Sequence, residues 1–448
     1  MENKLEKKYG LMTAISMVVG VVIGSGVFFK AEVVLSRTGG NMPLGILAWL
    51  IVGGIMVACS YVFAKMATHY DVKNGLVDFA ENTLGKRYAY NLVWFTTVIY
   101  IPSLCAVLAW VSARYTCSLL GWDIVGGSCM TITLFYLCAM YAMNALSPKL
   151  AGKFQVTTTV IKMIPLVLMA VVGTVYGVMN GTLVELFQES APAMGVSEAL
   201  MSAVVSVAFA FDGWILATTI NAELKDSKKN LPIALIAGAL VVIATYVLYY
   251  IGINGAVSVD VLLTAGENAV RIAFTRLFGT AAGTLVFVIV IISCLGTLNG
   301  LMLACCRGFY SLASRNEGPL PKMFKQVDPY TNMPTNSAIA GLFLSGFWLL
   351  YFYGANLSTG WFGNFCFDNS EMSIVAIYAM YIPMFIKFMV NAKGYNLFDR
   401  VITPIAAVCG CVLMVYAAYA GYGGSVFVHF FIVFAVIMAF GNIFYKSK

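Results

Sequence analysis

Long apolar stretches separated by short polar ones dominate this sequence of 448 residues. Twelve of them hold about the 20 apolar residues that an α-helix needs to cross the hydrocarbon core of a bilayer. They cover approximately 11–35, 43–66, 90–118, 128–146, 154–179, 198–221, 231–255, 280–312, 336–356, 367–390, 401–422 and 425–445. The eighth has a helical lead-in that could extend it back to 268. The pattern predicts an all-α polytopic membrane protein with twelve transmembrane helices.

The composition agrees with this interpretation. Hydrophobic residues make up 60% of the chain and charged residues 10%, whereas about a quarter of the residues in soluble domains are charged. The chain has 27 Lys and Arg, of which one, Lys162, lies within a span. If the N-terminus is cytoplasmic, most of the others lie on the cytoplasmic side of the membrane. The five exceptions are Lys30, Arg37, Arg114, Arg271 and Arg276. The positive-inside rule therefore predicts a multi-pass protein of the cell membrane with both termini in the cytoplasm, and the net charge of +7 indicates no nucleic-acid partner.

Side chains suited to metal binding or catalysis are scarce. The chain has two histidines, His69 and His429, and eleven cysteines that lie mostly within the spans without a CxxC motif. Cys117 and Cys129 flank one outer loop, where they either form a disulfide or remain small core residues. The sequence contains no GxxxxGK[ST] loop and no paired carboxylates at the centre of a span. We therefore expect no metal, no cofactor, no enzymatic activity and no direct use of ATP.

Two of the predicted spans are interrupted. The first contains GVVIGSGVFF, Gly20 to Phe29, and each glycine there costs a helix about 1 kcal/mol relative to alanine. The sixth contains FAFDGW, with Asp212 and Gly213 near its middle. Because the two breaks are offset by five spans, equivalent elements have opposite orientations, which is typical of inverted repeats with a binding site between them. The alternative for the first break is a GxxxG packing face.

A helix broken at mid-membrane leaves backbone groups without partners. Unwinding around Gly24 and Gly26 exposes carbonyl groups at the end of one half and N–H groups at the start of the other. Such groups cost several kcal/mol each in hydrocarbon unless protein, water or a ligand pairs with them. The N–H end attracts a carboxylate and the carbonyl end attracts an ammonium. Because one α-amino acid carries both groups, the breaks predict an amino-acid site.

Four motifs carry a resemblance to a known family. They are IGSGVFF in the first span, FAFDGW in the sixth, ELKDSKKNLPIALI after it, and ISCLGTLNGLMLACCRGFYSLASRNEGPLPKMF from Ile292 to Phe324. In order and spacing they resemble those of the amino acid–polyamine–organocation superfamily, and most of all its L-amino-acid transporter branch. The resemblance implies a LeuT-type fold of five-plus-five inverted repeats and two extra helices. The corresponding parts are a cytoplasmic N-terminus (1–10), a first repeat (11–179), a second repeat (198–390) and the extra helices (401–445).

The resemblance also implies a substrate site. The substrate carboxylate would lie on Ser25 and Gly26, with Gly24 opening the turn. The ammonium would meet carbonyl groups of the two broken spans. Phe209 stands where the branch has an aromatic gate over the bound substrate. The candidate substrate-binding residues are Val22, Ile23, Gly24, Ser25, Gly26, Tyr100, Phe209, Ala210, Asp212, Gly213, Thr297, Asn299 and Leu301.

The side-chain pocket follows from the same resemblance. Ala210 and Gly213 would leave space for the substrate side chain, with Tyr100 at the border of the pocket. Thr297 and Asn299 would supply polar contacts from the eighth span. Leu301 stands where some relatives with basic substrates have a tryptophan, a departure that argues against arginine as the substrate.

Lys162, in TVIKMIPLV, is the charged residue at the centre of the fifth span. A lysine there costs about 3 kcal/mol on insertion scales. The alternative is a lysine whose ammonium reaches the membrane edge, but Lys162 lies roughly 13 Å along the helix from Lys153, which is too deep for this to be easy. In the family it resembles, such a lysine replaces the cation of sodium-coupled relatives and ties the first span to the eighth. The expected partners are the carbonyls of 20–23 and the region of Ser293 or Thr297, and the implication is sodium independence.

Three acidic residues keep several roles open. Asp212 would cap the broken sixth span, accept a proton or face a cationic substrate; we favour the cap because neutral-substrate members share the DGW motif. Asp368 and Glu371 open the tenth span. We favour a solvated outer rim for both, with a role toward a cationic substrate or a proton as the alternative.

These features predict a sodium-independent transporter that exchanges small or medium neutral L-amino acids by alternating access. The alternatives are a proton-coupled amino-acid symporter and a carrier of cationic amino acids or amines. A channel is disfavoured because the spans lack repeated polar rings. The expected partners are the amino-acid substrate and the lipid bilayer, without nucleic acid and without an obligate protein partner.

Overall fold

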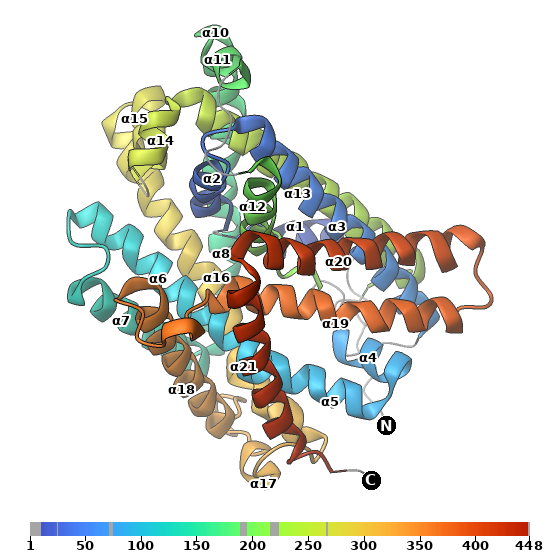
Figure 1. The fold of residues 1–448 in the computed structure, drawn as a ribbon. Helices are drawn as coiled ribbons and strands as arrows, with labels where there is room; N and C mark the ends of the chain where they lie inside the picture. The colour runs from blue at the N-terminus through green and yellow to red at the C-terminus, as the bar shows by residue number, and fades with distance from the viewer. Residues whose placement is uncertain are drawn as a thin grey trace.

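The computed structural model describes residues 10–24, 26–70, 75–188, 195–215, 224–265 and 268–446. These residues form helices joined by turns, with no β-strand among them (Figure 1). Ten helical segments within them are long and apolar enough to cross a membrane. They are α3 (Met42–His69), α5–η1–α6 (Lys86–Phe95, Thr96–Tyr100, Ile101–Leu120), α7 (Gly127–Leu146), α8–α9–η2–α10 (Pro148–Ile161, Met163–Leu168, Met169–Gly173, Thr174–Met179), α13 (Ser227–Ala256), α16 (Thr280–Ser314), α18–η4 (Thr335–Phe352, Tyr353–Leu357), α19 (Asn369–Asn391), η6–α20 (Phe398–Ile402, Thr403–Tyr422) and α21 (Gly424–Asn442).

The first and sixth predicted spans are the interrupted ones. The first is split into α1 (Leu11–Val22) and α2 (Gly26–Arg37), with Ile23 in an extended conformation after α1. In the sixth, α12 (Val196–Ala210) ends in a turn at 211–213. Gly213 in that turn has φ +93°, which glycine adopts without the strain that a side chain brings. Both breaks are therefore present where the glycines predicted them; the end of the sixth span, 216–221, lies outside the described residues.

Shorter helices occupy the connections. They are α4 (Leu76–Leu84), α11 (Thr182–Gln188), α14 (Val259–Ala265), α15 (Asn268–Phe278), α17 (Pro321–Phe324) and the 3-10 turn η5 (Gly363–Phe365). The proposed extension of the eighth span back to 268 is wrong, because Gly279 between α15 and α16 has φ +88° and ends the first helix. Cys117 and Cys129 are both buried and carry free thiols, which agrees with the core alternative for this pair.

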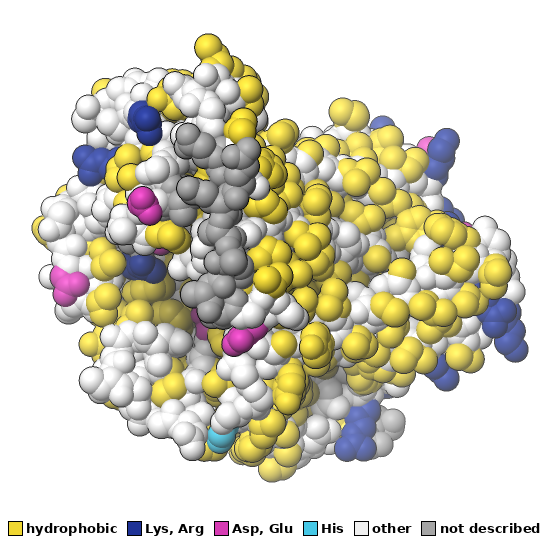
Figure 2. All heavy atoms as spheres, turned by 45° about the horizontal axis from the view of Figure 1, so that its top comes forward, with side chains coloured by type: hydrophobic (Ala, Val, Ile, Leu, Met, Phe, Trp, Pro, Cys, Tyr) yellow, Lys and Arg dark blue, Asp and Glu magenta, His cyan; other side chains and the backbone are white. Residues whose placement is uncertain are grey.

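The broken helices lie inside the bundle. Helix α1 packs on α13, α2 packs on α12, and α12 also contacts α3 and α20. Figure 1 shows α1, α2 and α12 near the centre, between α13 and α3 on one side and α16 on the other. The contact between α2 and α12 needs a glycine, since a Cβ at Gly26 would lie 2.7 Å from the Cα of Ala210. Outside this core, hydrophobic side chains cover most of the right half of the face in Figure 2, as a lipid-facing surface requires.

Candidate functional site

A cavity of about 230 Å³, here called the central cavity, lies where the broken helices meet. Ten of the predicted site residues line it: Val22, Gly24, Gly26, Lys162, Phe209, Ala210, Asp212, Gly213, Thr297 and Leu301. The other wall residues are Gly20, Leu104, Leu108, Gln155 and Gly300. The two breaks and the middle of α16 therefore share one cavity, whose remaining wall comes from α6 and α8.

Three of the predicted residues that the structure describes, Ile23, Tyr100 and Asn299, are not in that wall. Ser25 lies outside the described residues. Ile23 is fully buried beside the cavity, and Tyr100 reaches the cavity only through its contact with Asp212. Asn299 lies behind the wall formed by α16.

The amide of Asn299 is engaged by neighbouring helices. Its Nδ2 donates to the carbonyl of Ala151 (3.1 Å) and to Gln155 Oε1 (3.2 Å), and its Oδ1 accepts from Asn144 Nδ2 (2.9 Å). The structure thus places Asn299 away from the cavity, contrary to the expectation of a direct polar contact. Gln155, which it holds, is the polar wall residue that the sequence analysis missed.

Lys162 contacts the end of α1. In a continuous helix the carbonyl of Gly20 would accept from the N–H four residues later, and the break removes that donor. Lys162 Nζ takes its place at 3.0 Å from the Gly20 oxygen, with the lysine only 4% exposed. The expected partner among the first-span carbonyls is therefore present. The hydroxyl of Thr297 donates to the carbonyl of Ser293 (3.1 Å), both within α16.

Tyr246, on α13, was not singled out from the sequence. Its fully buried hydroxyl lies 2.9 Å from the carbonyl oxygen of Val22 and 3.0 Å from that of Ala210, the last residues of α1 and α12. Its single proton is shared between the two carbonyls. The ring packs edge-on against Trp49 and at a tilt against Phe211, and these contacts fix its position. One side chain therefore joins the ends of both broken helices, and the only sequence signal was a tyrosine hydroxyl at mid-span in need of a partner.

Asp212 is held from the third span. Tyr100 Oη lies 2.5 Å from each carboxylate oxygen of Asp212 and donates to them. Tyr100 ends the π-helical turn η1, a deformation that often occurs at functional sites. The carboxylate therefore faces the central cavity with one strong donor already bound.

Phe209 separates the central cavity from a second one. It lines the central cavity and is 8% exposed. Its ring packs edge-on against Phe29, with centroids 5.4 Å apart, and Lys30 Nζ lies 5.0 Å from its centroid. Phe29 and Lys30 belong to the wall of a cavity of about 250 Å³, here called the second cavity.

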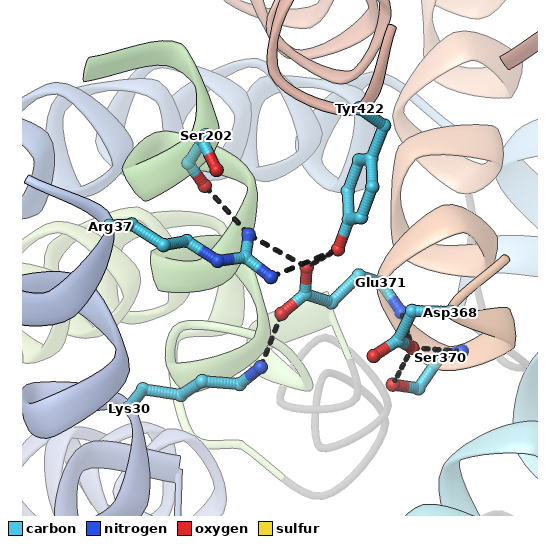
Figure 3. A network of polar contacts seen from close by, with 7 residues as sticks. All are labelled: Lys30, Arg37, Ser202, Asp368, Ser370, Glu371 and Tyr422. Carbon is cyan, nitrogen blue, oxygen red and sulfur yellow. Dashed lines mark hydrogen bonds and ion pairs between the residues drawn. The ribbon is translucent and has the colours of Figure 1, made fainter. Parts of the chain in front are cut away.

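A buried ionic network borders the second cavity (Figure 3). Lys30 and Tyr422 both donate to the carboxylate of Glu371, and Arg37 Nη1 donates to the same carboxylate at 3.2 Å. Arg37 also donates to the carbonyl of Ser202 at 2.8 Å. The network joins α2 to α12, α19 and α20.

The solvated-rim interpretation is wrong for Glu371. Its side chain has no exposed surface, because Lys30 and Arg37 of α2 supply two positive charges that make burial of the carboxylate possible. Asp368 instead caps α19, accepting from the backbone N–H of Ser370 (2.9 Å) and of Glu371 (3.0 Å).

Comparisons with known proteins agree on one family. A family model described as amino acid permease matches residues 9–444. The serine/threonine exchanger SteT of Bacillus subtilis (strain 168) is 29% identical over 416 residues, which cover 91% of this chain and 90% of that protein. The Asc-type amino acid transporter 1 of Mus musculus is 27% identical over 329 residues, covering 72% of this chain and 61% of its own length.

A solved structure supports the fold. The crystal structure of MhsT in complex with L-phenylalanine superposes with a TM-score of 0.60 at 14% identity, covering 93% of this chain and 99% of that one. At this identity the likeness concerns the fold, which is all-helical, polytopic and of the LeuT type.

Proposed function

The chain belongs to the amino acid permease family, and on that premise we propose that it is a sodium-independent exchanger of small or medium neutral L-amino acids that works by alternating access. Membership in the family makes it an amino-acid transporter of the membrane, not an enzyme. The observation that carries the finer proposal is the central cavity, into which both broken helices and Lys162 project.

The backbone of the breaks supports an amino-acid zwitterion as the ligand. In the proposed pose the carboxylate lies at the start of α2, on the N–H groups of 24–26, where the helix dipole is positive. The ammonium lies against the carbonyls at Val22, Ile23, Phe209 and Asp212. Carbonyl oxygens have two lone pairs, so the bond from Tyr246 to Val22 leaves room for a second donor.

The cavity wall supports a small neutral side chain. Glycine and alanine form the helix breaks, and Leu104, Leu108 and Leu301 supply apolar surface. Gln155 and Thr297 add polar groups that suit a hydroxyl. Since SteT, a relative over most of the chain, is a serine/threonine exchanger, we include serine and threonine among the proposed substrates.

Lys162 supports sodium independence. Its ammonium is fixed on the Gly20 carbonyl inside the membrane, and a sodium ion next to it would meet an unscreened like charge. We further propose that the repeats divide as 11–179 and 198–390, that both termini are cytoplasmic in the cell membrane, and that the chain works without a protein partner.

Purified protein in liposomes tests these proposals together. We expect uptake of labelled L-serine to rise at least about tenfold when the liposomes are preloaded with unlabelled serine, and to stay unchanged when choline replaces sodium. Equal uptake into empty liposomes would contradict exchange, and a loss of uptake without sodium would contradict the role of Lys162. Liposomes without protein are the control.

A proton-coupled symporter is the second candidate, favoured by the carboxylate of Asp212 in the cavity wall. For an exchanger, an inward pH gradient should leave serine uptake within about twofold of its value without the gradient, in both wild type and Asp212→Asn. For a symporter, the gradient drives uptake in wild type and loses this effect in Asp212→Asn, because the amide cannot carry the proton. Tyr100→Phe is the matched variant for Asp212→Asn, because it removes the hydroxyl that donates to Asp212 but keeps the Asp212 carboxylate.

A further inference from the structure

A groove of about 550 Å³, here called the aromatic groove, lies between α5, α16, α18 and α21, far from both cavities described above. Every residue of its wall is apolar, and six are aromatic: Trp94, Phe309, Phe347, Trp348, Phe440 and Phe444. Phe347 and Phe440 are 59% and 56% exposed. Because α18 and α21 cross the membrane, the groove opens toward lipid, and its wall suits a hydrocarbon chain.

The two tryptophans of the wall have no donor left for a polar ligand. Trp94 Nε1 donates to the carbonyl of Ile437 (3.0 Å), and Trp348 Nε1 donates to the carbonyl of Val98 (2.8 Å). The position of Trp94 also requires Gly441, since a Cβ there would lie 2.3 Å from the indole nitrogen. The floor of the groove is therefore both fixed and apolar.

Basic residues gather at one end of the groove. Arg87 on α5 reaches α21, where its Nε and Nη2 each lie 3.4 Å from Asn442 Oδ1. Asn442 stands two residues before Phe444 of the wall. Lys86 precedes Arg87 and Lys446 follows Phe444 by two residues, and all three cations are exposed. An apolar groove thus ends in a cluster of positive charge.

The short helix α17 adds to this cluster. Its Phe324 stacks on Phe309 of the wall, with centroids 4.8 Å apart. Lys322 and Lys325 flank Phe324 and are exposed, as is Leu320 at 65%. Exposed apolar and basic side chains side by side are typical of segments at a membrane interface. Figure 1 shows α17 and the C-terminus at the same end of the bundle.

Acidic residues near this end do not cancel the positive charge. Asp78 and Glu81 both pair with Arg315, at 3.8 and 2.9 Å. Glu317 interacts electrostatically with Lys86. The basic residues at the end of the groove outnumber this carboxylate, so the end as a whole attracts an anion.

We propose that the aromatic groove binds one anionic phospholipid of the inner leaflet, with an acyl chain in the groove and the phosphate on Arg87, Lys86 and Lys446. The proposal rests on the orientation proposed above, with a cytoplasmic C-terminus, since anionic lipids are concentrated in that leaflet. A guanidinium matches a phosphate in charge and geometry. From Val436 to Phe444 the wall runs roughly 12 Å along α21, close to the depth of about 15 Å of one leaflet.

The groove is linked to the central cavity through η1. Val98, which accepts the bond from Trp348, belongs to this π-helical turn, and the turn ends at Tyr100. Tyr100 in turn donates to Asp212 in the wall of the central cavity. A lipid packed on Trp348 therefore holds the turn that positions Asp212, and we expect it to increase the rate of exchange.

The first test counts lipids on the full-length protein by native mass spectrometry. Purified protein stripped of lipid is mixed with equal amounts of phosphatidylglycerol and phosphatidylcholine. We expect one phosphatidylglycerol per chain, retained at least about fivefold over phosphatidylcholine. Lys86→Gln combined with Arg87→Gln should lose this preference. Lys149→Gln combined with Lys153→Gln is the matched control, because it removes the same charge from exposed positions on α8 outside the groove.

A second pair of variants tests the place of the acyl chain. Leu344→Trp fills the groove without changing any charge, and we expect it to retain phosphatidylglycerol at least about fivefold less than wild type. Phe343→Trp, at the neighbouring lipid-facing position outside the wall, should behave like wild type. In liposomes of phosphatidylcholine, adding about a fifth of phosphatidylglycerol should raise serine exchange about threefold in wild type and leave it unchanged in Leu344→Trp.

The remaining outcomes would overturn the proposal. Equal loss of phosphatidylglycerol in both double variants would mean attraction to surface charge in general, and full retention in Leu344→Trp would place the chain outside the groove. Paired chains without lipid, separated by Leu344→Trp, would make the groove an interface between two copies. If wild type exchanges no serine in any liposome, the proposed substrate falls, while the lipid count still decides the groove.

Discussion

Lys162→Ala is expected to lower exchange at least about a hundredfold while the protein still inserts and folds. The lysine is the donor to the Gly20 carbonyl at the end of α1, and alanine leaves that carbonyl without a partner inside the membrane, which costs several kcal/mol. We expect the end of α1 to shift toward another donor, so that the carbonyls around the central cavity lose their arrangement. The fixed positive charge is lost at the same time.

The measurement is exchange of labelled serine in liposomes, with the amount of inserted protein determined in parallel. Lys153→Ala is the matched control, because Lys153 lies on the same helix but is exposed, and it should exchange like wild type. Uptake of Lys162→Ala at the wild-type level would remove Lys162 from the mechanism. If exchange appears only when sodium is added to this variant, the ammonium indeed stands where a cation would otherwise bind.

Tyr246→Phe is expected to raise the KM for serine about tenfold to a hundredfold. The change removes only the hydroxyl, which joins the carbonyls of Val22 and Ala210. Losing the donor to buried carbonyls costs about 1–3 kcal/mol, which corresponds to this range because 1.4 kcal/mol is tenfold. Without that link the ends of α1 and α12 are free to separate, and we expect the carbonyl groups to hold the substrate ammonium less well.

Tyr249→Phe is the matched control for this prediction. Tyr249 is on the same helix and equally buried, but its hydroxyl has no hydrogen-bond partner among the described residues. Its removal should leave both KM and the maximal rate near the wild-type values. Equal effects of the two substitutions would mean that the hydroxyl of Tyr246 has no particular role, and that α13 merely tolerates phenylalanine poorly.

The helices and their breaks could be predicted because they depend on local properties of the chain. The length of an apolar stretch decides whether a helix crosses the bilayer, and glycines show where it is interrupted. The same reasoning failed at 268–279, where one glycine with φ +88° separates α15 from α16. A glycine within a helical pattern either continues the helix or ends it, and its neighbours in sequence do not show which of the two occurs.

The resemblance to the amino-acid transporter branch is confirmed by the family match and the relatives. It located the residues around the central cavity, because the motifs at the two breaks and in α16 are contiguous in sequence. It did not locate Gln155 or Tyr246, which have no such motif around them. It also gave Asn299 a place at the substrate, whereas its amide holds Gln155 and α8.

The sequence alone determined which segments span the membrane, where two of them are broken and how deep Lys162 lies. Apolar length, glycine and charge each decide how a single segment behaves in the bilayer, independently of the other segments. Only the tertiary structure decided which groups meet. The Tyr246 hydroxyl donates to two carbonyls on helices that are distant in sequence. Glu371 is buried because Lys30 and Arg37 of α2 face it. Hydrogen bonds and ion pairs act over a few ångströms, and only packing brings residues far apart in the chain within that range.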